Sequence, residues 1–306
     1  MELSEFKSKA ATAAWMPYLL LATAPLCWGG NIVLARGVAE IIPPISFAFW
    51  RWTVALMLLL PFSYHQAGRD LILVVKNWKI MGFLSLTGIA MFNTLLYSAV
   101  HTTTAINGAL IQTAMPAVII LISLILFNEK VRAIQIFGVV LCMLGAVFVV
   151  IRGEWSTVST LSFAEGDIMM IVAVVLYALY SVFLKRKPQI HPVSFLVYTF
   201  GIGALGLLPF YVWELNAVGS FQVSKEVLFS ILYVSLFPSI VAYFCWNRGI
   251  ELIGANQGGL FINLIPVFAS ILAVILLGES VRLYHVAGMM MIFTGMMMFN
   301  RNFGRN

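Results

Sequence analysis

The residues best suited to binding a small molecule recur at intervals of four in the third apolar run of the chain. Asn93, Tyr97 and His101 share one face of a helix, because side chains at positions i and i+4 lie one above the other. Tyr243 and Trp246 belong to a similar stripe in the eighth apolar run. The amide, phenol and imidazole groups can hydrogen-bond a polar solute, and the rings can stack on an aromatic one. We predict that both faces line a cavity.

Further polar and aromatic candidates lie in four other apolar runs. They are Trp28 and Asn31 in the first run, Asn107 in the fourth, Tyr177 in the sixth, and Gln257 and Asn263 in the ninth. We predict that these residues also line a substrate cavity. In the alternative interpretation, the amides simply hydrogen-bond between helices and the rings near run ends belong to an interfacial aromatic belt.

Catalytic and metal-binding patterns are missing from the sequence. It contains no Walker A loop, no G-x-S-x-G and no H-E-x-x-H, and Cys27, Cys142 and Cys245 have no short spacing. We therefore expect no enzymatic activity, no metal and no cofactor. The acidic residues avoid the middle of the apolar runs, and His101 is the one obvious proton-sensitive group near the predicted pathway. This predicts weak or absent proton coupling.

The elements that must position these side chains are membrane-spanning helices. Of the 306 residues, 61% are hydrophobic and only 10% are charged, against about 25% charged residues in a typical soluble domain. The net charge of +6 is spread in short clusters, which argues against a nucleic-acid partner. The sequence predicts an all-α integral membrane protein, with ten spans near residues 16–35, 43–62, 80–99, 105–127, 133–151, 167–184, 192–213, 227–248, 255–277 and 283–300.

The distribution of Lys and Arg predicts that both termini are cytoplasmic, since cytoplasmic loops carry an excess of these residues. That side receives Lys7, Lys9, Arg69, Lys76, Lys79, Lys130, Arg132, Lys185, Arg186, Lys187, Arg248, Arg301 and Arg305. The opposite side receives Arg36, Arg152, Lys225 and Arg282.

The chain repeats itself at an offset of 266 − 116 = 150 residues. Pro116 pairs with Pro266 and Glu129 with Glu279, and the earlier segment 44–62 matches 192–210 at an offset of 192 − 44 = 148. We predict a first five-helix repeat over residues 1–152 and a second over 153–306, which together form one transport domain. Five helices per half invert the second half in the membrane, an architecture typical of secondary transporters.

Two kinds of charged residue near or within the runs are assigned mainly structural roles. Arg51 lies inside the second run, where it could hold a substrate carboxylate, snorkel to the interface or bind loop carbonyls. Glu129 and Glu279 follow the fourth and ninth runs, where each could cap the next helix or pair with Arg. Pro116 and Pro266 should bend their helices.

These motifs resemble the EamA-type branch of the drug/metabolite transporter superfamily. The resemblance covers nearly the whole chain, and the residues that carry it are Cys27-Trp28-Gly29-Gly30-Asn31, Arg51, Gly166-Asp167, Tyr177-Ala178-Leu179-Tyr180, Phe127-Asn128-Glu129-Lys130 and Leu277-Gly278-Glu279-Ser280. Within this branch the sequence is most similar to the YddG-type exporters of aromatic amino acids, which implies a multi-pass protein of the bacterial inner membrane.

The resemblance and the aromatic candidates together predict a secondary transporter that exports small metabolites by alternating access. Amino acids, including aromatic ones, are the expected substrates, and the lipid bilayer is the other partner. Rings such as Trp28 and Tyr177 would also attract cations, so a broad-specificity drug or cation exporter of the same fold is the nearest alternative. A membrane-embedded enzyme is the alternative from another class.

Overall fold

The computed structural model describes residues 14–277 and 282–300, and within these ranges the chain is helical without a β-strand. The elements are α2 (Met16–Val38), α3 (Pro44–Lys76), α4 (Trp78–Leu84), η1 (Ser85–Met91), α5 (Phe92–Thr102), α6 (Ala105–Thr113), α7 (Met115–Phe127), α8 (Ala133–Val150), α9 (Ser156–Ser159), α10 (Glu165–Phe183), η2 (Leu184–Arg186), α11 (Pro192–Val218), α12 (Lys225–Val234), η3 (Ser235–Val241), α13 (Ala242–Ile253), α14 (Ala255–Gly259), η4 (Leu260–Leu264), α15 (Ile265–Leu277) and α16 (Leu283–Asn300).

Nine helical segments of the described chain are long and apolar enough to cross a membrane. Several combine consecutive elements, such as Trp78–Thr102, which joins α4, η1 and α5. Helix α2 is not among the nine, although it has 23 residues and packs inside the bundle against α13 and α15. The protein is thus an all-helical, multi-pass membrane protein, because a helix satisfies its own backbone hydrogen bonds in lipid.

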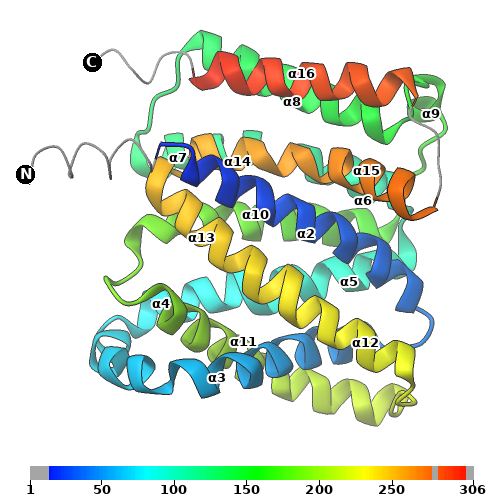
Figure 1. Cartoon of the computed structure of the whole chain (residues 1–306). Helices are drawn as coiled ribbons and strands as arrows, with labels where there is room; N and C mark the ends of the chain where they lie inside the picture. Colours follow the sequence, from blue (N-terminus) through cyan, green and yellow to red (C-terminus); the bar gives the residue numbers. More distant parts are fainter. Residues whose placement is uncertain (1–13, 278–281, 301–306) are drawn as a thin grey trace, which may run out of the picture.

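The helices form a bundle whose two ends can be told apart (Figure 1). Helix α2 begins and α16 ends at the left of this view, and we call this end the terminal side. The short helix α9 lies at the other end, which we call the α9 side. Helices α8 and α16 lie together at one edge of the bundle, and α3 and α11 lie together at the opposite edge.

Glycines allow the backbones of α8 and α16 to approach closely. A Cβ atom on Gly138 would lie 2.6 Å from the Gly295 carbonyl oxygen, and one on Gly145 would lie 2.7 Å from the Gly288 carbonyl oxygen. Between these two contacts, the Cys142 thiol donates to the Ile292 carbonyl at 3.2 Å. Small residues at a helix crossing are a common basis of packing in lipid, where dispersion contacts replace the hydrophobic effect.

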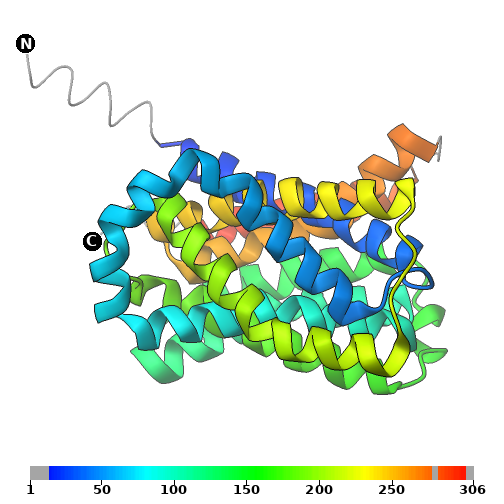
Figure 2. The same ribbon diagram turned by 90° about the horizontal axis from the view of Figure 1, so that it is seen from below.

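Helices α3 and α11 pack together and run antiparallel (Figure 2), and each caps the first turn of the other. Near the end of α11, Glu214 accepts hydrogen bonds from the Ile45 and Ser46 amides at 3.1 and 2.6 Å. Near the end of α3, Asp70 accepts from the His191 amide at 3.1 Å. Each carboxylate therefore stabilises the positive N-terminal end of the other helix.

This capping explains why the second predicted span was too short. We expected it to end near residue 62, with Arg69 in a loop, whereas α3 continues to Lys76. The additional turns contain Asp70, which is 8% exposed and is held by the start of α11. A polar stretch thus remains helical because the neighbouring helix satisfies its carboxylate.

Irregular helical turns occur where the sequence predicts bends. Helix α6 ends at Thr113 just before Pro116, and η4 ends and α15 begins next to Pro266.

Two π-helical segments, η1 and η3, lie 150 residues apart, at Ser85–Met91 and Ser235–Val241. A π-helical turn changes the backbone hydrogen-bond pattern, and such turns are frequent at functional sites.

Candidate functional site

The guanidinium of Arg51 is completely buried inside the bundle. Its Nη1 donates to Asn93 Oδ1 at 2.7 Å and to Tyr97 Oη at 2.6 Å. Its Nε donates to Ser239 Oγ at 2.6 Å and its Nη2 to the Pro238 carbonyl at 2.9 Å. Among the ion pairs of the described residues none involves Arg51. Neutral acceptors therefore hold this charge, and Arg51 does not snorkel to the interface.

Tyr97 also donates to Asn31 Oδ1 at 3.0 Å, which joins α5 to α2. A matching bond joins α10 to α13, where Tyr180 Oη donates to Asn247 Oδ1 at 2.7 Å. Asn247 follows Tyr97 by 247 − 97 = 150 residues, so the two halves make the same Tyr–Asn bond with the residue types exchanged.

The π-helical segments present carbonyl oxygens to side chains of other helices. In η1, the Gly88 carbonyl accepts from Tyr243 Oη at 2.6 Å. In η3, the Pro238 carbonyl accepts from Trp28 Nε1 at 3.1 Å as well as from Arg51. Asn93 Nδ2 completes the network by donating to Tyr243 Oη at 3.1 Å. Most of the predicted cavity face is thus engaged in fixed hydrogen bonds.

Aromatic rings form a cluster around Trp28 in the middle of α2. Its ring centroid lies 5.6 Å from that of Tyr177, 6.1 Å from Tyr243 and 5.3 Å from Trp246. Phe92 closes the cluster at 4.5 Å from Tyr177. The sequence-based prediction placed four of these five residues together, and tilted or edge-on ring pairs of this kind are favourable.

The space beside this cluster is small. Trp28, Asn31, Asn93 and Tyr177 line a central void of about 20 Å³, room for little more than one water molecule. The hydroxyl of Tyr177 is buried without a hydrogen-bond partner. A buried hydroxyl that lacks a partner costs about 1–3 kcal/mol, so this group is available to a molecule that enters the void.

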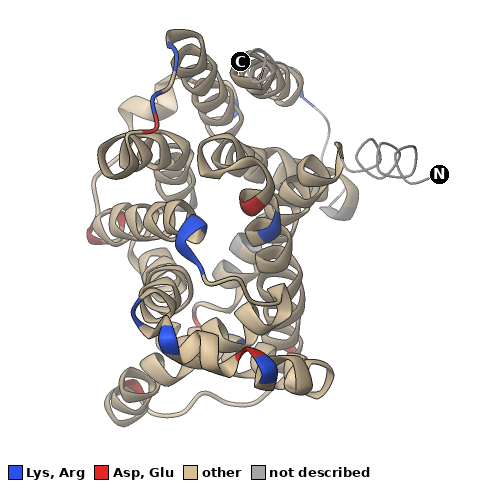
Figure 3. Ribbon diagram, turned by 90° about the vertical axis from the view of Figure 1, so that its left-hand side faces the viewer, with Lys and Arg blue, Asp and Glu red and all other residues tan. Residues whose placement is uncertain are grey.

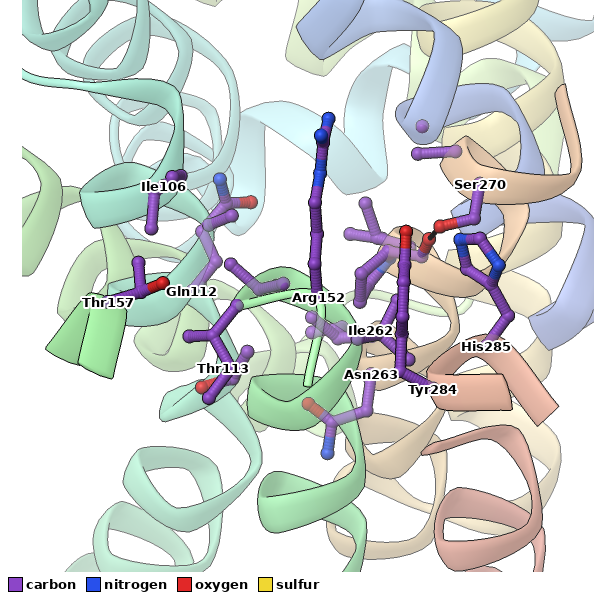
Figure 4. A pocket seen from close by; sticks show the side chains of 18 of the residues that line it. Ile106, Gln112, Thr113, Arg152, Thr157, Ile262, Asn263, Ser270, Tyr284 and His285 are labelled. Carbon is purple, nitrogen blue, oxygen red and sulfur yellow. Dashed lines mark hydrogen bonds between the residues drawn. The ribbon is translucent and has the colours of Figure 1, made fainter. Parts of the chain in front are cut away.

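A much larger cavity of about 670 Å³ lies on the α9 side, and we call it the vestibule. Its wall comes from Gly29 of α2, from α6, from the end of α8 and the segment 151–157, from η4 and α15, and from the start of α16. Figure 4 shows Arg152 standing between Gln112 on one side and His285 on the other. Gln112, Ile262 and Ile265 line both the vestibule and the central void, so the two spaces adjoin.

The vestibule also contains a polar group that the protein leaves unpaired. Asn263 is 1% exposed, and neither its Oδ1 nor its Nδ2 has a hydrogen-bond partner. The vestibule has this unpaired amide in its wall, and it adjoins the void beside the aromatic cluster. Together these two spaces are suited to binding a small polar molecule with an apolar part.

Comparison with known proteins agrees with this arrangement. The model of the EamA-like transporter family matches residues 15–151 and again residues 164–301. The chain belongs to the EamA-like transporter family. It is 28% identical to the uncharacterized transporter YyaM of Bacillus subtilis over 281 residues, with 92% of each chain covered. It is 26% identical to the uncharacterized transporter YetK of the same organism, covering 91% of this chain and 84% of the relative.

A solved crystal structure has the same fold. It superimposes on this EamA-like chain with a TM-score of 0.74 at 19% identity, and the match covers 94% of this chain and 99% of the other. The family and the relatives named as transporters support a transport role, and the solved structure supports the fold.

The remaining predicted site residues of this EamA-like protein lie near the ends of the helices. On the α9 side, Asn107 Nδ2 donates to Asp167 Oδ2 at 3.0 Å, and His101 is exposed near the end of α5. On the terminal side, Gln257 Nε2 donates to Tyr18 Oη at 3.1 Å. These three residues do not join the aromatic cluster.

Basic and acidic positions occur on several helices at the terminal side, which faces the viewer in Figure 3, and ion pairs connect helices there. Lys185 Nζ lies 2.5 Å from Glu129 Oε1, and Asn256 Nδ2 donates to Glu129 Oε2 at 3.1 Å. Lys187 Nζ lies 3.3 Å from Glu251 Oε1. The predicted pairing of Glu129 with Arg or with the start of α8 was wrong, since Gln135 accepts from the Arg132 amide there instead. Glu279 lies outside the described residues.

The sequence-based prediction named Asn263 but missed most of the wall of the vestibule. Arg152 and Glu154 come from the segment that follows α8, and Tyr284 and His285 come from the first turn of α16, at the ends of apolar runs where no polar face was predicted. The available signal was the Arg152-Gly153 pair directly after an apolar run, where glycine marks a helix end. The described residues contain no group of His, Cys, Asp and Glu that could hold a metal ion.

Proposed function

We propose that this protein is a secondary transporter that exports small metabolites, chiefly amino acids including aromatic ones, by alternating access. The observation that carries the proposal is the asymmetry of the two ends. The vestibule of about 670 Å³ on the α9 side adjoins the central void beside the aromatic cluster. On the terminal side, the cavity beside Lys187 and Glu251 measures about 10 Å³.

In this proposal α2 is the tenth span, and the chain consists of two inverted five-helix repeats, residues 1–152 and 153–306. Reciprocal contacts support the inversion. Gly138 meets Gly295, which is 145 + 150, and Gly145 meets Gly288, which is 138 + 150. Asn93 bonds Tyr243 and Cys142 bonds Ile292, each pair 150 residues apart. Contacts of this type are those expected around a pseudo-two-fold axis.

The positive-inside pattern supports cytoplasmic termini, and the resemblance to YddG-type exporters supports a bacterial inner membrane. The vestibule then opens to the outside, and the Glu129–Lys185 and Glu251–Lys187 pairs close the cytoplasmic side. The inward-facing state would break these pairs and narrow the vestibule, because inverted repeats exchange their roles.

The aromatic cluster supports the proposed substrate class. A substrate ring passing from the vestibule would meet Trp28 and Tyr177, and the Tyr177 hydroxyl would gain the hydrogen bond that it lacks. The resemblance to YddG-type exporters is consistent with this substrate. We infer weak or no proton coupling, so that export is downhill for an accumulated metabolite.

The test is efflux of labelled phenylalanine from liposomes that contain the purified protein. We expect saturable efflux that Trp28→Ala reduces at least tenfold and that Leu228→Ala, at an exposed position on α12, leaves unchanged. A pH-sensitive dye should report no proton flux upon substrate addition. Efflux equal to that of protein-free liposomes would refute the substrate class.

A drug or cation exporter is the second candidate, favoured by the same rings because cations bind aromatic faces. Competition between phenylalanine and a lipophilic cation distinguishes the amino acid exporter from the drug or cation exporter. Tetraphenylphosphonium should inhibit phenylalanine efflux weakly if amino acids are the substrates. Strong inhibition, with transport of the cation itself, would favour the alternative.

A further inference from the structure

Arg152 occupies a backbone position that disfavours arginine. Its φ is 56°, in the left-handed region, directly after the end of α8. The Arg152 amide bonds the Val149 carbonyl at 3.1 Å and the Gly153 amide bonds the Phe148 carbonyl at 2.9 Å. These are the two bonds of a Schellman motif, whose left-handed residue is usually glycine. Non-glycine residues pay roughly 1 kcal/mol or more in this region.

This strained turn places a cation in the vestibule. Arg152 lines the cavity and stands among its wall residues in Figure 4. Its side chain is exposed, and the ion pairs of the described residues do not include it. Asn263 lies in the same wall with its amide unpaired. A guanidinium offers two parallel N–H groups to a carboxylate, a geometry that lysine cannot reproduce.

We propose that Arg152 is a carboxylate-binding residue of the vestibule, which receives small aromatic carboxylates before they reach the central cluster. The inference rests on the proposed function for its role in transport, while the binding site itself can be tested separately. Glu154 lines the same cavity and carries the opposite charge. It weakens the binding of a simple carboxylate through like-charge repulsion, and it offers a partner to the ammonium group of an amino acid.

The experiment measures binding of labelled benzoate to the purified full-length protein at neutral pH. We expect saturable binding that benzylamine does not displace. Arg152→Gly should weaken benzoate binding at least tenfold, and Arg152→Lys should retain part of it. Glu154→Gln should strengthen it severalfold. The matched control is Lys225→Gln, which removes an exposed positive charge at the start of α12 that does not line the vestibule.

The unfolding temperature of Arg152→Gly shows whether weaker binding comes from loss of the site or from damage to the fold. Arg152→Gly should raise the unfolding temperature, because glycine accepts the left-handed conformation without strain. Weaker binding by a more stable protein would therefore support the proposal. Wild-type protein without saturable benzoate binding, or equal binding by wild type and Arg152→Gly, would overturn it.

Phenylalanine efflux distinguishes this failure from failure of the proposed function. Efflux without Arg152-dependent benzoate binding would refute the site and leave the transporter assignment intact. Arg152-dependent binding without efflux of phenylalanine would support the site and refute the substrate of transport.

Discussion

Tyr97 donates a hydrogen bond to Asn31 across 3.0 Å, and the second half of the chain repeats this bond with tyrosine and asparagine exchanged. In the repeat, Tyr180 donates to Asn247 across 2.7 Å. The two halves of the chain therefore preserve the interaction between two helices, although they do not preserve which helix carries the donor.

Removing one partner of the Tyr180–Asn247 hydrogen bond should destabilise the protein by more than the net energy of that bond. Asn247 Nδ2 already lacks a partner, so Tyr180→Phe leaves the whole amide unpaired and should cost about 1–3 kcal/mol of stability. Thermal unfolding in detergent measures this loss. Adding Asn247→Leu to Tyr180→Phe should recover part of it. A double variant less stable than either single variant would contradict the assignment.

Replacing Arg51 should lower the stability of the protein more than replacing any other charged residue of the bundle. Arg51→Ala removes four buried hydrogen bonds to acceptors in α5 and η3 and leaves Asn93 Oδ1 without a partner. Each buried polar atom left unpaired costs about 1–3 kcal/mol. We expect a large drop in unfolding temperature, or no folded protein. Arg69→Ala, in the terminal part of α3 and exposed, is the matched control. An Arg51→Ala protein with wild-type stability would show that the network contributes little.

The α8–α16 crossing should not tolerate even one methyl group. Alanine at Gly138 or Gly145 would place its Cβ within 2.6–2.7 Å of a carbonyl oxygen of α16, which forces the helices apart. Both variants should unfold at lower temperature. Gly82→Ala is the control, because a Cβ at Gly82 meets nothing within 4 Å and alanine favours helix by about 1 kcal/mol. Equal changes in unfolding temperature in Gly82→Ala and Gly145→Ala would contradict this account.

The ion pairs on the terminal side should stabilise the conformation in which the vestibule is open on the α9 side. Glu129→Gln together with Glu251→Gln removes the partners of Lys185, Lys187 and Arg248. Spin labels at Lys130→Cys and Leu252→Cys should then show a new, longer distance, since population shifts toward an open terminal side. The buried native cysteines should not react with the label. An unchanged distance distribution would show that these pairs do not act as a gate.

Tyr177→Phe should separate binding from stability. The Tyr177 hydroxyl has no partner in the folded protein, so its removal should leave the unfolding temperature unchanged or slightly raised. If this hydroxyl meets the substrate, the apparent KM for phenylalanine efflux should rise severalfold. Tyr243→Phe, which loses the Gly88 carbonyl as acceptor, should instead lose stability. Unaltered transport kinetics in Tyr177→Phe would exclude the hydroxyl from the binding site.

The helices were largely predictable from the sequence, because a bilayer requires long apolar runs and these runs are visible directly. Helix α16 at Leu283–Asn300 coincides with its predicted run. The terminal turns of α3 were not predictable, since they depend on a hydrogen bond between Asp70 and the start of α11. Side-chain direction was also hidden, because helices that are apolar all round do not reveal which face is inside.

The aromatic part of the candidate site was predictable for a different reason. Tryptophan and tyrosine in mid-span are few, so Trp28, Tyr177 and Tyr243 stood out and indeed lie together. The vestibule was not predictable, because Arg152 and Tyr284 reach it from the ends of α8 and α16. Their meeting depends on the crossing of those helices, which no local sequence pattern encodes.

The most direct test of the central claim is counterflow into liposomes that contain the purified protein. Unlabelled phenylalanine is loaded inside, labelled phenylalanine is added outside, and the uptake of label is followed over time. Alternating access predicts a transient accumulation of label that requires internal phenylalanine and is reduced at least tenfold by Trp28→Ala. Label that enters at the same rate with empty and loaded liposomes, or no faster than without protein, would contradict the account.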